Sequence, residues 1–155
     1  MHFRISGIDP TPFRHLFGLS DDDLAQRRAK RYVADSKPGY PCRISLEDAE
    51  PGETVILAPY AHQTASTAYQ SAGPIFVREN AKARFEAVDV VPDQLTGRLL
   101  SLRVYDESGM MIDADVVEGR DLRTNIDRFF GDDQAAYVHA HFARRGCYAA
   151  RIDRA

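Results

Sequence analysis

The sequence has no tryptophan, only two cysteines and no long hydrophobic run. No segment approaches the ~18 consecutive apolar residues that a membrane-spanning helix needs, and the residues after Met1 lack the apolar core of a signal peptide. These absences predict a cytoplasmic protein that makes no contact with a membrane. Because the cytoplasm is reducing and two cysteines do not make a disulfide framework, Cys42 and Cys147 are expected to be thiols, with one reversible bridge as the alternative.

An excess of positive charge is also absent. The 155 residues include 20 lysines and arginines against 23 aspartates and glutamates, which gives a net charge of -3. Proteins that bind nucleic acid through its phosphates usually carry a clear basic excess, so nucleic acid is not expected as a partner. The length and the 44% hydrophobic content predict a single domain over residues 1–155, which can hide most of its apolar surface without a metal or a disulfide.

Short strand-like segments fill most of the chain, and helical patterns occur mainly near its two ends. Strands are predicted at 3–6, 44–46, 54–57, 74–78, 85–91, 98–105 and 110–117, followed by a hairpin over 137–151. Short helices are predicted just after Pro12 and over about 21–28, and an amphipathic helix over about 121–130. Strands that do not alternate regularly with helices indicate an α+β fold with a mostly antiparallel sheet.

The hairpin over 137–151 holds the first candidate site. Successive side chains of a strand point to opposite faces, so His139 and His141 are predicted to share one face while the apolar residues between them turn to the core. A three-residue turn with Gly146 in the left-handed conformation, which we favour, would bring Cys147 to the histidine face. A turn with an even number of residues would place this cysteine on the apolar face.

Residues 60–73 have no hydrophobic period and are rich in alanine, serine and threonine. This composition predicts a loop of about fourteen residues that covers a pocket near the hairpin. Tyr60 and His62, with Arg78 and Arg144, offer phenol, imidazole and guanidinium groups that can hold a small anion. The opposing interpretation is that Tyr60 and His62 satisfy main-chain groups and that Arg78 pairs with a surface acid.

Metal and thiol chemistry are two further hypotheses. His139 and His141 could share one ion, with His62 or a thiol as a third ligand. His-x-His is common by chance, arginines follow the pair and no carboxylate partner is evident, so we expect no metal and name no cofactor. Cys147 lies near cationic groups that activate a thiol and is a candidate nucleophile, although a lone cysteine in a strand is more often a small buried residue.

Several motifs also occur together along the chain. They are KPGYPCR (37–43), SLEDA (45–49), PGE (51–53), YAHQ (60–63), GPIFVRE (73–79) and the terminal HAH to GCY segment (139–148). In this order they resemble a bacterial family catalogued as domain of unknown function 1203, and the likeness spans nearly the whole chain. The resemblance implies no catalytic residue, because that family is named for the absence of a known activity.

The leading functional hypothesis is therefore a pocket for a small anionic metabolite, which is bound there or undergoes simple acid–base chemistry. His139 and His141 would be the polar or proton-transfer groups, His62 their partner, and Arg78 or Arg144 the anion clamp. This hypothesis requires that the two imidazoles of the strand face a hollow that solvent reaches.

The competing hypothesis is a protein that is not an enzyme. In one form it is a thiol-responsive regulator that uses Cys42 and Cys147. In the other form it is a homodimer in which the edge of the C-terminal hairpin pairs with a partner, since an unpaired strand edge is a template for β-pairing.

Overall fold

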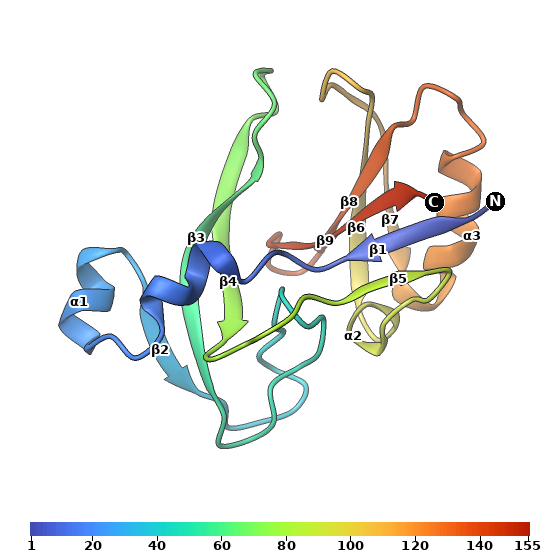
Figure 1. Cartoon of the computed structure of the whole chain (residues 1–155). Coiled ribbons are helices and arrows are strands. Elements are labelled where there is room, and N and C mark those ends of the chain that lie inside the picture. The colour runs from blue at the N-terminus through green and yellow to red at the C-terminus, as the bar shows by residue number, and fades with distance from the viewer.

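The computed structural model of the protein describes residues 1–155 and consists of two antiparallel sheets with a few short helices (Figure 1). The strands are β1 (Phe3–Ser6), β2 (Lys30–Val33), β3 (Thr54–Gln63), β4 (Ser71–Arg78), β5 (Glu86–Val88), β6 (Leu99–Tyr105), β7 (Met111–Glu118), β8 (Tyr137–Phe142) and β9 (Tyr148–Arg154). The helices are α1 (Asp21–Gln26), α2 (Asp93–Thr96) and α3 (Leu122–Phe129), with 3-10 turns η1 (Thr11–Leu16) and η2 (Gly119–Asp121). The expected α+β fold is confirmed.

The larger sheet has the strand order β5-β1-β9-β8-β6-β7, and α3 covers one of its faces. Leu122, Ile126 and Phe129 form the apolar stripe of α3, as their spacing predicts, and they share one buried cluster with Val138 and Ala140 of β8. Figure 1 shows α3 on one side of this sheet and the β3–β4 hairpin on the other. The apolar face of β8 therefore packs against α3.

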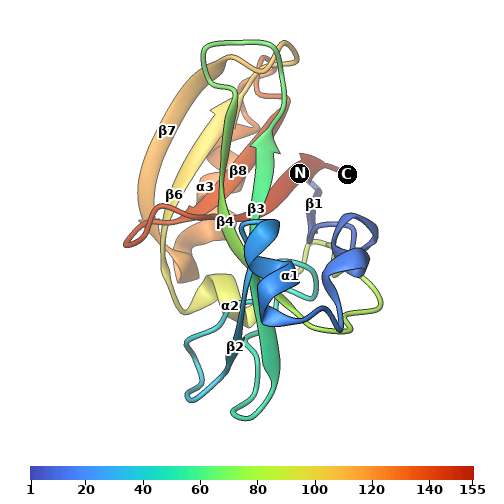
Figure 2. The same cartoon turned by 90° about the vertical axis from the view of Figure 1, so that its left-hand side faces the viewer.

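The smaller sheet has the order β2-β3-β4 and covers the other face of the larger one. Ile56 and Ala58 of β3 and Ile75 of β4 share a second buried cluster with Tyr148 of β9. Figure 2 views the molecule with β3 and β4 in front of the larger sheet. The face of β8 that carries histidines is thus enclosed by a second sheet instead of bordering solvent.

The prediction of a long loop over 60–73 is wrong, because β3 runs to Gln63 and β4 begins at Ser71. Tyr60 and His62 are half-buried and alternate with the exposed Pro59 and Ala61. This alternation has the period of two that a strand requires. The inward positions, however, hold aromatic rings instead of the usual aliphatic side chains. Only the tip of the hairpin is irregular.

Other element predictions differ in detail. Residues 44–46 form a turn instead of a strand, with Leu46 at a φ of 52°, and the strand expected over 85–91 shortens to β5. The short N-terminal helix after Pro12 is a 3-10 turn, whereas α1 begins as predicted, with Ser20 Oγ accepting a hydrogen bond from Asp23 N–H at 3.1 Å. None of the helices, the longest of which has eight residues, could span a bilayer.

Candidate metal centre

Three imidazoles meet between the two sheets. β8 places His139 and His141 on the face towards the small sheet, and β3 brings His62 across from them. The ring centroid of His62 lies 4.9 Å from that of His141 and 6.2 Å from that of His139. The three candidate ligand atoms, one from each ring, all lie within 4.8 Å of one another. We call these three residues the histidine cluster.

The histidine cluster is largely buried. His139 is 2% exposed, His141 is fully enclosed, and His62 is partly exposed at the outer side of β3. The expectation that the imidazoles of β8 face a hollow reached by solvent is therefore wrong. The physical reason is the β3–β4 hairpin, which packs on this face of the large sheet.

The hydrogen bonds of the cluster leave lone pairs without partners. His141 Nδ1 lies 3.0 Å from the carbonyl oxygen of Gly146. Because a carbonyl can only accept, Nδ1 carries the hydrogen and His141 Nε2 carries a lone pair. Five buried side-chain nitrogen or oxygen atoms in the protein have no hydrogen-bond partner, and three are His62 Nδ1, His139 Nδ1 and His141 Nε2. Buried polar atoms without partners are rare and destabilising, so their concentration at one point marks this cluster as the candidate ligand site.

Burial keeps these imidazoles neutral. It lowers the pKa of His139 to about 3 and that of His141 to about 4, and it also lowers the pKa of His62. Nearby arginines add to the effect, with Arg151 acting on His139 and Arg103 acting on all three rings. At neutral pH the cluster therefore holds unprotonated nitrogens, which suits metal ligands. It suits proton donation near pH 7 less well.

Tyrosine rings hold the imidazoles in place. The ring of Tyr148 stacks on His62 with centroids 5.4 Å apart and meets His139 edge-on at 5.2 Å. Tyr105 and Tyr137 also pack on His139, with ring centroids at 5.1 and 5.2 Å. These contacts orient the rings before any ligand binds. Sequence reasoning missed Tyr105 and Tyr148, because their approach depends on how the strands pair.

A surface pocket of about 390 Å³ lies next to the histidine cluster, and the side chain of Tyr148 lies between the two. Its lining includes Tyr60, Tyr148 and Arg151, together with further charged side chains from β1 and β5. Tyr60, a predicted ligand-binding residue, packs on Tyr148 with centroids 5.6 Å apart. The structure therefore brings Tyr60 near the histidine cluster, where the sequence hypothesis placed it.

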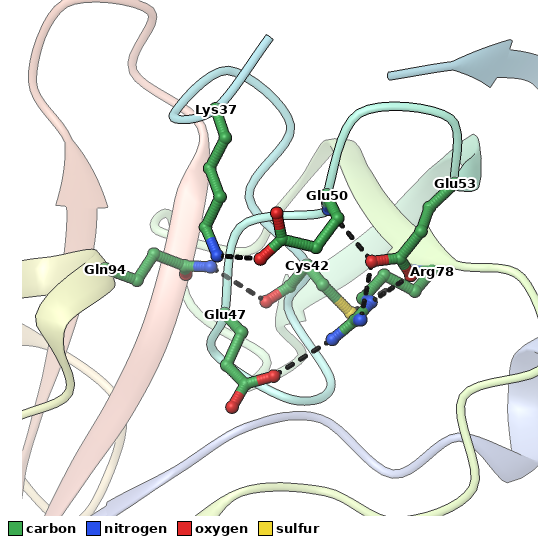
Figure 3. Close-up of polar contacts among 7 residues, drawn as sticks. All are labelled: Lys37, Cys42, Glu47, Glu50, Glu53, Arg78 and Gln94. Carbon is green, nitrogen blue, oxygen red and sulfur yellow. Dashed lines mark hydrogen bonds and ion pairs between the residues drawn. The ribbon is translucent and has the colours of Figure 1, made fainter. Parts of the chain in front are cut away.

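Arg78, the predicted anion clamp, lies in a different network. Its guanidinium donates to both carboxylate oxygens of Glu53 at 2.8 and 2.7 Å and to Glu47 at 2.9 Å (Figure 3). In the strand register Arg78 pairs with Val55, seven positions before His62, which separates the two by roughly 20 Å along β3. The structure therefore does not bring Arg78 to the histidines.

The turn between β8 and β9 also differs from the favoured arrangement. The N–H of Phe142 donates to the carbonyl of Cys147 at 2.9 Å, so four residues form the turn and Cys147 lies opposite Phe142. The preference for a three-residue turn is wrong, and Cys147 does not join the histidine face. Gly146 does adopt the left-handed conformation, with a φ of 77°. Arg144 is exposed in this turn and forms no ion pair, so it is not part of the cluster.

The two cysteines are free thiols. Cys42 is fully buried, and its Sγ accepts a hydrogen bond from the N–H of Arg78 at 3.2 Å, a contact that Figure 3 includes. Cys147 is half-buried. A thiol-responsive pair remains a prediction. β8 pairs with β6 and β9 pairs with β1, so neither hairpin strand is an edge strand of the large sheet. A homodimer likewise remains a prediction.

The comparisons with known proteins bear on the family alone. Residues 39–154 match the family model described as protein of unknown function (DUF1203). No curated protein and no solved structure matches the chain. The matched region contains the histidine cluster and the strands β3 to β9. Because the match covers well over half of the chain and agrees with the motifs read from the sequence, the protein belongs to the DUF1203 family.

Proposed function

We propose that this protein binds one divalent transition-metal ion, Zn²⁺ being the first candidate, through His62, His139 and His141. The observation that supports the proposal is the unpartnered lone pair of His141 Nε2, which lies buried beside two other imidazoles whose Nδ1 atoms also lack partners. Imidazole nitrogens bind Zn²⁺ at about 2.0–2.1 Å. A tetrahedral ion with such bonds separates its ligand atoms by about 3.4 Å, so the three nitrogens, which lie within 4.8 Å of one another, would draw together when the ion binds.

The partner of His141 supports the same proposal. Metal-binding histidines almost always donate their second ring N–H to a carbonyl or a carboxylate, which fixes the tautomer and turns the lone pair to the metal. His141 makes this contact with the Gly146 carbonyl. The turn that places this carbonyl is the segment in which Gly146 adopts a positive φ, so the turn geometry also serves the proposed ligand.

The proposal departs from the expectation of no metal that the sequence favoured. That expectation rested on the chance frequency of His-x-His, the arginines that follow the pair and the absence of a carboxylate partner. The close approach of His62, which the sequence offered as a possible third ligand, supports the present proposal. Three protein ligands leave one position of a tetrahedral ion open, an arrangement associated with Lewis-acid chemistry on a bound water or substrate. The function we propose is thus metal binding at an open three-histidine site.

The test is a cobalt titration of protein that was purified without an affinity tag and freed of metal with a chelator. We expect one equivalent of Co²⁺ to bind with the visible absorption of tetrahedral Co²⁺, and Zn²⁺ to displace it. His141→Leu removes a ligand, so it should lower the metal affinity by more than the ~10- to 100-fold typical of losing an outer partner. The matched control is His15→Leu, which changes an exposed histidine.

The proposal is wrong if the wild-type protein does not bind Co²⁺. It is also wrong if His141→Leu binds Co²⁺ as tightly as the wild-type protein does. His62→Ala provides a second variant at a partly exposed position, where the fold is less sensitive to substitution. It should lose the tetrahedral absorption even if the His141 variant does not fold.

A further inference from the structure

We infer that the open position of the metal takes a small oxyanion, a carboxylate or a phosphate, and that Arg103 is the cation that holds it. The inference rests on the proposed metal site. It starts from the strand register, because Arg103 of β6 and Arg151 of β9 are the two cross-strand partners of His139. Directly opposed residues in antiparallel strands share one face, so a row of arginine, histidine and arginine crosses the face that carries the cluster.

The two arginines of this row differ in how their charge is compensated. Arg151 Nε donates to both carboxylate oxygens of Asp153 at 2.9 and 3.0 Å, and the guanidinium lies over the ring of Tyr137 at 3.9 Å. Arg103 forms no ion pair with any carboxylate of the protein and is only half-buried. Its charge is therefore not neutralised within the chain, although the guanidinium also contacts the Tyr105 hydroxyl and acts on the pKa of that group.

A further cation without an ion pair lies nearby. Arg43 is 3% exposed and donates to the main-chain carbonyls of Tyr148 and Pro41, while the Asp48 carboxylate acts on its pKa only from a distance. Arg43 lies close enough to His141 to contribute to the lowered pKa of that imidazole. None of the largest electrostatic influences on the three imidazoles comes from a carboxylate.

These charges determine what the fourth ligand must be. The three neutral imidazoles cannot neutralise a divalent ion, and the buried surroundings add positive charge instead of removing it. Burying uncompensated charge is costly, so the loaded site needs an anion from outside the chain. The planar guanidinium of Arg103 offers two parallel N–H donors, which match the paired oxygens of a carboxylate or a phosphate.

His62 and Arg103 are both partly exposed, whereas the three unpartnered imidazole nitrogens are buried. A small anion would therefore enter from the side of these two residues. Ser101, the register partner of His141, brings a hydroxyl donor to the same face. One oxygen of the anion would occupy the open position of the metal, and another would accept from Arg103.

The experiment uses the Co²⁺-loaded full chain and two probes, acetate and inorganic phosphate, each titrated in a buffer that does not bind metal. We expect at least one of them to shift the visible spectrum of the wild-type protein saturably. Arg103→Met should weaken that anion's affinity by about tenfold or more, the value of one charge-assisted contact, while Co²⁺ still binds. Arg144→Met is the matched control, because Arg144 is also unpaired but lies in the exposed turn.

The outcomes separate the two proposals. If Co²⁺ binds but neither probe changes the spectrum, or if Arg103→Met binds the anion as the wild-type protein does, the inference about the anion is overturned and the metal site stands. If Co²⁺ does not bind, both fall. Arg103→Lys keeps the charge but not the paired donors, so an intermediate anion affinity is expected there. If Arg103→Met does not fold, the anion affinity of Arg103→Lys tests the role of Arg103 instead.

Discussion

Metal-free protein should lose roughly 4 kcal/mol of folding free energy between pH 7 and pH 5. Burial lowers the pKa of His139 to about 3 and that of His141 to about 4, whereas both titrate near 6.5 in the unfolded chain. As the pH falls below 6.5, the unfolded state binds protons that the folded state cannot, so stability falls with pH. Each histidine contributes up to about 1.4 kcal/mol per pH unit in this window. Urea unfolding at pH 7, 6 and 5 with a chelator present measures the effect.

The carboxylates of the protein act in a separate pH window. Arg31 beside Glu79 lowers the pKa of that carboxyl to about 2, and Arg78 likewise lowers the pKa of Glu53. A lowered carboxyl pKa contributes stability that is present above the ordinary value and is lost as the pH falls through it and below. Loss of stability between pH 7 and 5 therefore reports on the histidines.

Two variants complete this experiment. The double variant His139→Leu, His141→Leu should show a nearly flat profile between pH 7 and 5, and the exposed-residue variant His15→Leu should follow the wild-type profile. A wild-type profile that is flat in this range would mean that the folded protein accepts these protons without penalty. That result would contradict the burial of the cluster.

Most of the fold follows from patterns that are visible in the sequence. Alternation of apolar and polar residues predicts β1, β6 and β7, and the spacing of apolar residues predicts α3. The main error, the loop over 60–73, arises because Tyr60 and His62 turn inward in the place of aliphatic residues, so a search for hydrophobic period does not detect the strand. Pairing with β4 satisfies the main chain of this segment, and no local pattern encodes that pairing.

The candidate site could be predicted in part. Strand parity places His139 and His141 on one face, and the structure agrees. Whether that face meets solvent depends on the small sheet, which packs through contacts between β3 and β8, far apart in the sequence. The register shift between Ala140 and His141, which sets Tyr148 opposite His141, is also not visible in the sequence. Without these two features the imidazoles looked like an open pocket instead of a buried cluster.

His139→Leu should leave metal-free protein at least as stable as the wild type at pH 6, yet abolish its stabilisation by zinc. The substitution removes a buried nitrogen without a partner and replaces it with an apolar side chain of similar size. Zinc at 100 times its dissociation constant should stabilise the wild-type protein by about 2.7 kcal/mol. Without zinc, the variant should unfold at the same temperature as the wild type or a higher one. With zinc, the wild-type protein should have the higher unfolding temperature.

The matched control for this reversal is Val138→Ala, the preceding residue on the opposite face of β8, where Val138 packs in the core beneath α3. It should destabilise the protein by roughly 1–3 kcal/mol with or without zinc and keep the full zinc effect. The contrast between the two faces of one strand then separates a ligand from a packing residue. If His139→Leu instead destabilises the metal-free protein strongly and zinc stabilises it as it does the wild type, His139 is a core residue and the metal site is wrong.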